Sequence, residues 1–362
     1  MSARKPRRRR RLLDWRALIG IGISVALLWW AFHEEDPAAI WAELKLADPL
    51  LFVLAAAAAT GVFWIRAWRW KAILAAAAPD TAFRSRFAAV SIGFMGNNLL
   101  PLRVGEFARV YALSRMERVS MVASFGSLVI ERLFDGIFVV LLLFVAVSLP
   151  GFPVVETNTY LAVARGLGVM IALAVIILTL LVWQPVRAVR VFQRIVVVLL
   201  PKKLERPLVD ALEAFLAGVS SLRNPWLVLR VSAWSLVLWL FNAVGFYVGL
   251  FAFGMHLPFE AALFLQSAVA LAVSIPSGPG FFGPFEGATR LVLVDIFGAD
   301  RAQALAYAIG FHLAGFIPIT LIGLFYAWRL GLSLRQVAET EEVVEERVEM
   351  ETGIEPVQGE QR

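Results

Sequence analysis

Apolar residues fall in long blocks along nearly the whole chain, and short polar or basic stretches separate the blocks. A helix needs about 20 mainly apolar residues to cross the hydrocarbon core of a bilayer. Blocks that approach or exceed this length predict about six membrane spans, at residues 17–32, 49–65, 120–149, 161–183, 226–253 and 303–328. Two shorter apolar blocks remain, at 87–100 and 261–275.

The distribution of Lys and Arg gives the orientation of the spans. Cytoplasmic loops of membrane proteins are rich in these residues. The basic residues 1–11 therefore place the start of the chain inside, and the mostly acidic stretch 33–48 is expected as an external loop. The basic stretch 66–86 is expected on the cytoplasmic side. Basic residues and helical periodicity at 184–224 predict an amphipathic helix on the inner surface.

The two short apolar blocks predict re-entrant hairpins. The block 87–100 has basic residues on both sides, which places both of its ends in the cytoplasm. A short apolar segment whose ends share one side of the membrane is better interpreted as re-entrant than as spanning. The last span runs inward only if residues 261–298 enter and leave from the outside. The sequence therefore predicts two re-entrant half-helix pairs, one from each side.

The order of these elements repeats with opposite orientation. The halves 17–150 and 161–330 each read as two spans, a re-entrant pair and a further span, which is the plan of many secondary transporters. The predicted fold is an all-α polytopic membrane protein with about six full spans, two re-entrant half-helix pairs and an inverted repeat. A basic cytoplasmic head (1–16) and an acidic cytoplasmic tail (331–362) flank the membrane domain (17–330). We expect a multi-pass protein of the cytoplasmic (inner) membrane with both termini cytoplasmic.

The composition excludes several classes of site. Hydrophobic residues make up 60% of the chain and charged residues 17%, against about 45–50% and about 25% in soluble domains. The absence of cysteine excludes disulfides, thiol nucleophiles and thiolate metal sites. The three histidines are far apart and have no metal-binding spacing. Basic cytoplasmic loops account for the net charge of +6, so we expect no nucleic acid, no metal and no cofactor.

Three groups of polar residues lie at or near membrane depth, where an unpaired charge costs about 2.5–3.5 kcal/mol. In the first group, a proline and a glycine interrupt the helix and free backbone groups that two asparagines can bond. A glutamate and an arginine three residues apart share a helix face. The candidate residues are Asn97, Asn98, Pro101, Arg103, Gly105, Glu106 and Arg109. The alternative is an ordinary cytoplasmic loop with a surface ion pair.

The second group is Glu131, Arg132 and Asp135, about a dozen residues into a span. Glu131 and Asp135 share a helix face, and Arg132 can reach Asp135. The group is either a structural ion pair between helices or a carboxylate that binds a proton or a headgroup, with Arg132 tuning it.

The third group follows the block 261–275 and consists of Pro276, Gly280, Gly283, Glu286 and Arg290. Residues 278–283 match the pattern GxGxxG, but no strand precedes them, so a dinucleotide site is excluded. We expect an unwound segment with Glu286 at the start of the returning half-helix, where the helix dipole favours a carboxylate. The alternative is a Gly/Pro-rich external loop.

Single polar and aromatic residues in the spans have simpler interpretations. His312, in the last span, is interpreted as a packed, hydrogen-bonded residue rather than a proton relay. The tryptophans are interpreted as residues of the membrane interface rather than as a stacking site; they are Trp29, Trp30, Trp68 and Trp70.

The three groups also carry a family resemblance. The motifs GNNLLPLRVGEFAR (96–109), ERLFD (131–135) and IPSGPGFFGPFE (275–286) resemble the membrane domain of lysylphosphatidylglycerol synthases, the flippase part of MprF-type proteins. The resemblance covers residues 15–330 and implies movement of aminoacylated lipid between leaflets. Full-length members add a soluble aminoacyl-tRNA transferase domain. The residues after the last span are too few and too polar for one, so we do not expect that activity here.

We therefore expect a lipid flippase or transporter that works by alternating access and has no catalytic residues. Its cargo would be a polar-headgroup lipid such as an aminoacyl-phospholipid or a polyprenyl-phosphate sugar. The phosphate candidates are Arg103, Arg109, Arg132 and Arg290, because a guanidinium forks onto phosphate oxygens. The candidates for an amine, a sugar hydroxyl or a coupling proton are Glu106, Glu131, Asp135 and Glu286. The alternatives are a membrane-embedded lipid-modifying transferase and a non-transporting partner of a separately encoded enzyme.

Overall fold

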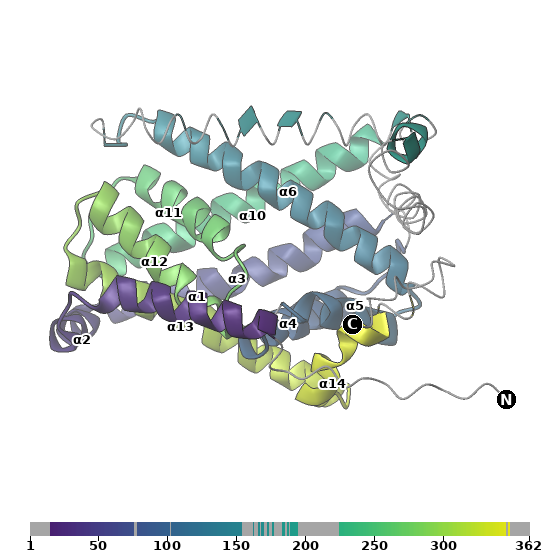
Figure 1. Ribbon diagram of the computed structural model, residues 1–362, viewed down its shortest axis with the longest axis horizontal. Helices are drawn as coiled ribbons and strands as arrows, with labels where there is room; N and C mark the ends of the chain where they lie inside the picture. Colours follow the sequence, from purple (N-terminus) through teal and green to yellow (C-terminus); the bar gives the residue numbers. More distant parts are fainter. Residues whose placement is uncertain are drawn as a thin grey trace.

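A computed structural model describes residues 15–75, 78–101, 103–153 and 224–344, together with some of the residues between 162 and 194 and Arg347 (Figure 1). Within this described part all regular structure is helical and no strand occurs. This confirms the all-α prediction. The helices in chain order are α1 (Trp15–Phe32), α2 (Pro37–Leu46), α3 (Pro49–Leu74), α4 (Phe83–Leu99), α5 (Gly105–Met116), α6 (Met121–Ser148), α10 (Pro225–Ala252), α11 (Phe259–Ala272), η3 (Pro279–Phe281), α12 (Pro284–Arg290), η4 (Leu291–Ile296), α13 (Arg301–Arg329) and α14 (Leu334–Ala338).

Three of the described helices are long and apolar enough to cross a membrane, namely α3, α10 and α13. A fourth span is possible if the pair α1 and α2, which is bent by 81°, counts as one. Helix α6 has 28 residues but carries three ionised groups in its middle. Many large apolar side chains on these helices are exposed, such as Trp226 and Leu321, as expected where lipid covers the surface. The number of spans and the inverted repeat stay predictions.

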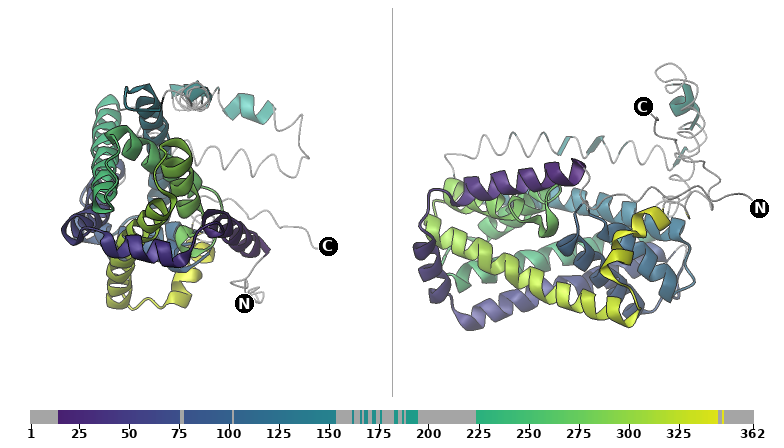
Figure 2. Two further views of the ribbon diagram at one scale, coloured as in Figure 1. Left: turned by 90° about the vertical axis from the view of Figure 1, so that its left-hand side faces the viewer. Right: turned by 60° about the horizontal axis from the view of Figure 1, so that its bottom comes forward.

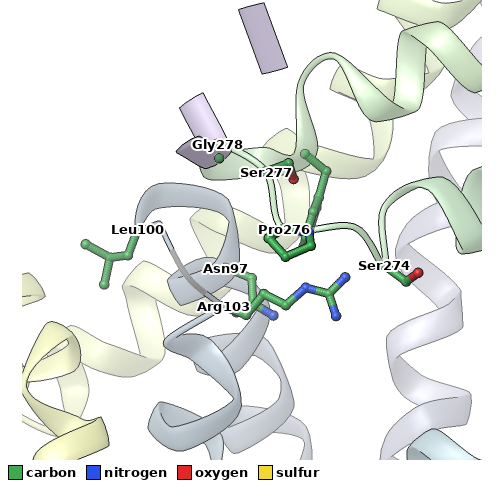
Figure 3. Close-up of a pocket in the computed structure, with 9 residues that line it drawn as sticks. Asn97, Leu100, Arg103, Ser274, Pro276, Ser277 and Gly278 are labelled. Atoms are coloured by element: carbon green, nitrogen blue, oxygen red, sulfur yellow. The ribbon is translucent and has the colours of Figure 1, made fainter. Parts of the chain in front are cut away.

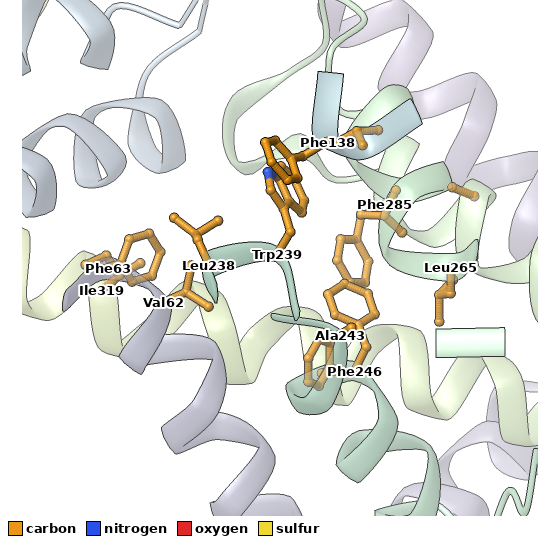
Figure 4. Close-up of a cluster of buried hydrophobic side chains, with 14 of the residues drawn as sticks. Val62, Phe63, Phe138, Leu238, Trp239, Ala243, Phe246, Leu265, Phe285 and Ile319 are labelled. Carbon is orange, nitrogen blue, oxygen red and sulfur yellow. The ribbon is translucent and has the colours of Figure 1, made fainter. Parts of the chain in front are cut away.

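The helices pack around a continuous apolar core. The buried side chains labelled in Figure 4 come from several helices: Val62 and Phe63 of α3, Phe138 of α6, Leu238, Trp239, Ala243 and Phe246 of α10, Leu265 of α11, Phe285 of α12 and Ile319 of α13. Helices α10 and α3 form the most extensive helix pair, and α13 packs along α4. These long helices therefore make the scaffold that holds the shorter ones.

Two helical hairpins point into this scaffold from opposite ends of its long axis (Figure 1). The first consists of α4 and α5, and the second of α11 and α12 with its π-helical continuation η4. Helix α1 lies beside α12, and α14 packs on α4 and α5 (Figure 2). The predicted pairing of short half-helices is confirmed as two hairpins, and their re-entry into a bilayer stays a prediction.

The structure corrects two expectations about loops. The stretch 33–48 contains helix α2, whose N-cap is Asp36 and whose first residue is Pro37; both are strong helix-start residues. Helix α3 does not end at residue 65 but continues to Leu74, so the first part of the expected cytoplasmic stretch is helical and packed.

Several predictions lie outside the described residues. They are the span 161–183 and the amphipathic helix 184–224, apart from isolated helical residues, most of the basic head, and the end of the acidic tail.

Candidate functional site

The first hairpin turns at a break between α4 and α5. Leu100 ends α4 in an extended conformation, as expected for a residue before proline, and Arg103 has a positive φ of 56°. Helix α5 starts at Gly105, where a Cβ atom would lie 1.8 Å from the carbonyl oxygen of Gly93. Only glycine therefore lets α5 begin so close to α4. The two helices can then hold the tip of the hairpin in one position.

The second hairpin turns through an unwound segment between α11 and α12. Gly280, Phe281 and Gly283 have positive φ values of 71°, 61° and 98°. Helix α1 covers this segment: Gly278 donates its N–H to the Ser24 hydroxyl at 2.9 Å, and a Cβ atom on Gly283 would lie 2.4 Å from the Ser24 carbonyl oxygen. The three glycines of the segment are buried. The expected unwound segment is thus found, and it is packed rather than an open external loop.

A cavity of about 170 Å³ lies where the two breaks meet (Figure 3). Two of its lining residues, Ser274 and Pro276, are exposed, so the cavity lies at the surface of the described structure. At about 30 Å³ per water molecule, it has room for a small polar group such as part of a headgroup. The lining residues are Gly20, Asn97, Leu100, Arg103, Ser274, Pro276, Ser277, Gly278 and Phe281.

Arg103 supplies the positive charge of the cavity and joins the two breaks. Its guanidinium donates to the carbonyl oxygen of Val273 and lies 5.6 Å from the centre of the Phe281 ring. Among the described residues, no carboxylate lies within salt-bridge distance of Arg103, and no donor reaches the buried Asn97 Oδ1. The cavity therefore offers a cation without a bound counter-ion.

A buried network of charges lies next to the first hairpin. Arg109 binds Glu131 through two parallel contacts, with Nη1–Oε1 2.9 Å and Nη2–Oε2 3.0 Å. Arg69 Nη1 lies 2.6 Å from Asp135 Oδ1, and Arg66 Nη1 lies 3.4 Å from Glu131 Oε1 and 3.2 Å from Asp135 Oδ2. All five side chains are buried. Arginines of α3 and α5 thus neutralise both carboxylates of α6.

The network continues toward the surface and into neighbouring helices. Arg132, whose side chain is 43% exposed, lies 3.0 Å from Glu106 and 3.4 Å from Asp135. The guanidinium of Arg109 stacks 3.8 Å above the ring of Trp70, whose indole donates to a hydroxyl of α6 at 2.8 Å. In total, four arginines face three carboxylates. The arrangement holds α3, α5 and α6 together. It therefore resembles the first of the two interpretations given for the second group, a structural ion pair between helices.

A second buried polar group joins α13 to the unwound segment. His312 Nδ1 lies 2.6 Å from Glu286 Oε1, and His312 Nε2 lies 2.9 Å from the carbonyl oxygen of Gly280. Glu286 Oε2 accepts the N–H of Gly283 at 2.6 Å, so Glu286 lies in the first turn of α12 as predicted. The predicted packed, hydrogen-bonded state of His312 is confirmed.

The structure separates the candidate residues into distinct roles. Asn97, Arg103 and Pro276 line the cavity. Asn98 is not a lining residue and donates to Thr320 of α13 at 2.8 Å. The Asn98 amide therefore bonds to α13, and not to freed backbone of its own break as expected. Pro101 and Gly105 shape the turn.

The arginines expected at a phosphate divide in the same way. Arg109 and Arg132 belong to the charge network. Arg290 lies 4.2 Å from the centre of the Trp30 ring and 3.2 Å from Glu34. Only Arg103 of the four lines the cavity. Glu106 and Arg109 do not form the surface pair of the alternative interpretation, because Glu106 binds Arg132 and Arg109 binds Glu131.

Arg66 and Arg69 belong to the charge network but were not among the predicted site residues, and Trp70 differs from its predicted position. Because they follow an apolar block, both arginines were assigned to the cytoplasmic stretch 66–86, yet both are buried in α3. One signal in the sequence could have indicated them. The motif 131–135 has a net charge of −1, and at membrane depth it requires a cation from another segment. Trp70 is fully buried and carries the stacked guanidinium of Arg109, so its interpretation as an interface residue is wrong. The ring of the half-buried Trp30 carries the guanidinium of Arg290.

Comparisons with known proteins identify a family of membrane proteins. The profile described as lysylphosphatidylglycerol synthase TM region matches residues 17–323. A UPF0104 membrane protein of Methanothermobacter thermautotrophicus is 24% identical over 85% of this chain and 91% of its own length. The glycosyltransferase AglD of Haloferax volcanii is 26% identical over 86% of this chain but 54% of its own length. A UPF0104 membrane protein of Methanocaldococcus jannaschii is 24% identical over 64% of this chain. No solved structure matches the chain.

Proposed function

We propose that this chain, which belongs to the lysylphosphatidylglycerol synthase TM region family, moves a lipid with a phosphate-bearing polar headgroup across the cytoplasmic membrane by alternating access. The chain is a multi-pass membrane protein. The observation that carries the proposal is the cavity between the two breaks with Arg103 in its wall. A guanidinium without a carboxylate partner is suited to a phosphate, because its planar donors match two phosphate oxygens.

The position of the cavity supports alternating access. Broken helices are tolerated at membrane depth where they are buried or line a cavity, and transporters bind their substrates where such half-helices meet. Here the two breaks contact each other through Arg103, Val273 and Phe281. Movement of one hairpin relative to the other would therefore change the walls of the cavity directly.

A membrane-embedded lipid-modifying transferase is the second candidate, because one relative bears the name of a glycosyltransferase. A general base must be free to take a proton from its substrate. Three of the candidate carboxylates, Glu106, Glu131 and Asp135, are instead engaged by arginines. This argues for a transporter that catalyses no covalent step. A non-transporting partner of a separately encoded enzyme is the third candidate.

A leaflet assay with the purified protein tests the proposal. Liposomes carry labelled aminoacyl-phosphatidylglycerol, polyprenyl-phosphate sugar or plain phospholipid, and a membrane-impermeant reagent reports which lipid changes leaflet. We expect selective movement of one lipid class and at least a tenfold loss in Arg103→Gln, since about 1.4 kcal/mol of lost binding gives a factor of ten. Arg118→Gln, at an exposed position after α5, is the matched control and should keep the wild-type rate.

Each other outcome contradicts a part of the proposal. If Arg103→Gln moves lipid at the wild-type rate, the cavity is not part of the transport path. Formation of a modified lipid by the purified protein would favour the transferase. Movement of none of these lipids would favour the non-transporting partner.

A further inference from the structure

The buried pair Glu286 and His312 has a hydrogen count that can be worked out from its contacts. A backbone carbonyl oxygen can only accept a hydrogen bond, so His312 Nε2, which lies 2.9 Å from the Gly280 oxygen, carries a hydrogen. The 2.6 Å contact between His312 Nδ1 and Glu286 Oε1 also needs a hydrogen, on either the nitrogen or the oxygen. The pair therefore holds one proton more than a neutral imidazole beside a carboxylate, and its net charge is zero.

Loss of that extra proton forces one of the two contacts to break. A single hydrogen is then left on the imidazole. If it is on Nδ1, it donates to the Glu286 carboxylate, and the bare Nε2 faces the Gly280 oxygen. If it is on Nε2, it donates to Gly280, and the bare Nδ1 faces the carboxylate. Two facing acceptors repel each other, so the deprotonated pair cannot hold both Gly280 and Glu286 in their present positions.

The residue that His312 contacts, Gly280, is next in the chain to a residue of the cavity wall. Gly280 precedes Phe281, which lines the cavity and lies below the Arg103 guanidinium. Gly280 has a φ of +71°, and a Cβ atom on it would lie 2.8 Å from the Phe316 ring. This peptide is thus held in an unusual conformation by packing and by the His312 contact. Release of His312 would free the wall residue of the cavity.

The surroundings leave the pair without another charged partner in the described structure. His312 packs against the rings of Phe282, Phe285 and Phe316. Many charged and titratable groups of the packed elements are engaged elsewhere: Arg290 and Arg301 by Glu34, Arg66 and Arg69 by carboxylates of α6, Arg86 by Ala67 and Thr81, Glu260 by Gly151, Tyr307 by Phe246 and Arg103 by Val273. Arg329 is exposed, and Glu43, Lys71, Tyr247 and Tyr326 are half-buried. Lys45, Arg84, Arg230 and Asp295 are exposed.

We propose that Glu286 and His312 form a proton-binding site, and that the proton bound there is the coupling ion of the lipid movement. The bound proton keeps His312 in contact with Gly280 and Glu286 together. Its release to water leaves a net charge of −1 on the pair and frees the Gly280–Phe281 wall of the cavity. The coupling role rests on the proposed function, whereas the proton site itself can be tested without any lipid.

The absence of cysteine gives a clean test of the site. The variant Ser277→Cys places a single thiol in the cavity wall, three residues before Gly280. Its rate of reaction with a polar thiol reagent is measured in nanodiscs over about pH 5–9, a range that includes the usual titration of histidine. The reference is the double variant that also carries Glu286→Gln. Its amide N–H₂ group can donate to His312 Nδ1 at every pH, so both contacts of His312 can persist where the wild-type pair would release its proton. Because both proteins carry the same cysteine, the ratio of their rates removes the common pH dependence of the thiol.

We expect a ratio near one at low pH and a several-fold higher rate in Ser277→Cys alone at high pH. A ratio that does not change with pH overturns the proton-controlled wall.

Nitrogen NMR provides a second readout that does not depend on the folding of Glu286→Gln. The chain has three histidines, so the ring signals of His312 are identified by comparison with His312→Gln. We expect the protonation of the ring nitrogens of His312 to change as the pH is raised. One unchanged tautomer over the whole range overturns the site.

The leaflet assay then tests coupling. We expect lipid movement by the wild-type protein to change several-fold when a pH gradient is imposed, and movement by Glu286→Gln not to respond to the gradient. A wild-type rate that ignores the gradient overturns the role of coupling ion. Failure of all lipid movement together with pH-dependent labelling would refute the proposed function and leave the proton site supported.

Discussion

Replacement of Glu131 by glutamine tests whether the buried charge network holds the fold. Glu131 is fully buried and accepts two hydrogen bonds from Arg109, with Arg66 and Arg69 each within 3.4 Å. The change to Gln removes one negative charge and leaves four arginines against two carboxylates. It also turns an amide N–H₂ group toward a guanidinium. Breaking a buried ion pair by removing one partner costs about 3–5 kcal/mol, and we expect a loss of stability in this range.

The assay is equilibrium unfolding in mixed micelles with increasing denaturing detergent, followed by helix content. Arg103→Gln is the matched variant, since it also removes one charge but breaks no ion pair within the described residues. We expect its stability to stay within about 1 kcal/mol of the wild type. A double variant, Glu131→Gln with Arg109→Gln, should lose less than the sum of the two single changes, with a coupling energy of about 0.5–3 kcal/mol.

The opposite pattern would refute this reasoning. If Glu131→Gln unfolds like the wild type and loses lipid movement, then Glu131 acts in transport and not in holding the helices together. If Arg103→Gln is the less stable of the two, the assignment of Arg103 to the cavity rather than to the scaffold is wrong.

Two further changes test the packing of the hairpins in the same unfolding assay. Gly105→Ala should destabilise by about 3 kcal/mol or more, because its Cβ atom would lie 1.8 Å from the Gly93 carbonyl oxygen, whereas Gly136→Ala, with no described atom within 4 Å, should gain a few tenths to about 1 kcal/mol; similar effects at the two sites would contradict the close approach of α4 and α5. Asn98→Ala should cost about 1 kcal/mol, since it loses the 2.8 Å hydrogen bond to Thr320, and an unchanged midpoint would argue against that bond.

The hairpins could be predicted from the sequence because their signals are local. Short apolar length, a proline and glycines at each break predicted that α4 and α11 stop where they do. The start of α2 was also readable, since Asp36 and Pro37 are a common N-cap and first residue of a helix. It was missed because the acidic charge of the stretch was given more weight than its helix-start residues.

The charge network could not be derived in the same way, because its partners are far apart in the sequence. Arg66 lies 65 residues before Glu131, and Arg69 lies 66 residues before Asp135. The rule that basic residues lie in the cytoplasm treats each charge as a surface feature. A buried arginine escapes this rule once a carboxylate from another helix binds it, and that pairing depends on how α3 and α6 pack.

Arg103 connects the cavity with the contact between the two hairpins. The end of α11 leaves carbonyl groups without a helical partner, as every helix end does, and Arg103 of the other hairpin binds one of them, that of Val273. A guanidinium has five N–H donors, so Arg103 can bind an anionic headgroup and keep this contact. In the proposed transport cycle, a headgroup bound there would be in reach of both tips and would stabilise their contact. Separation of the tips would remove Arg103 from one wall of the cavity, and the headgroup would then be released on the side that opens.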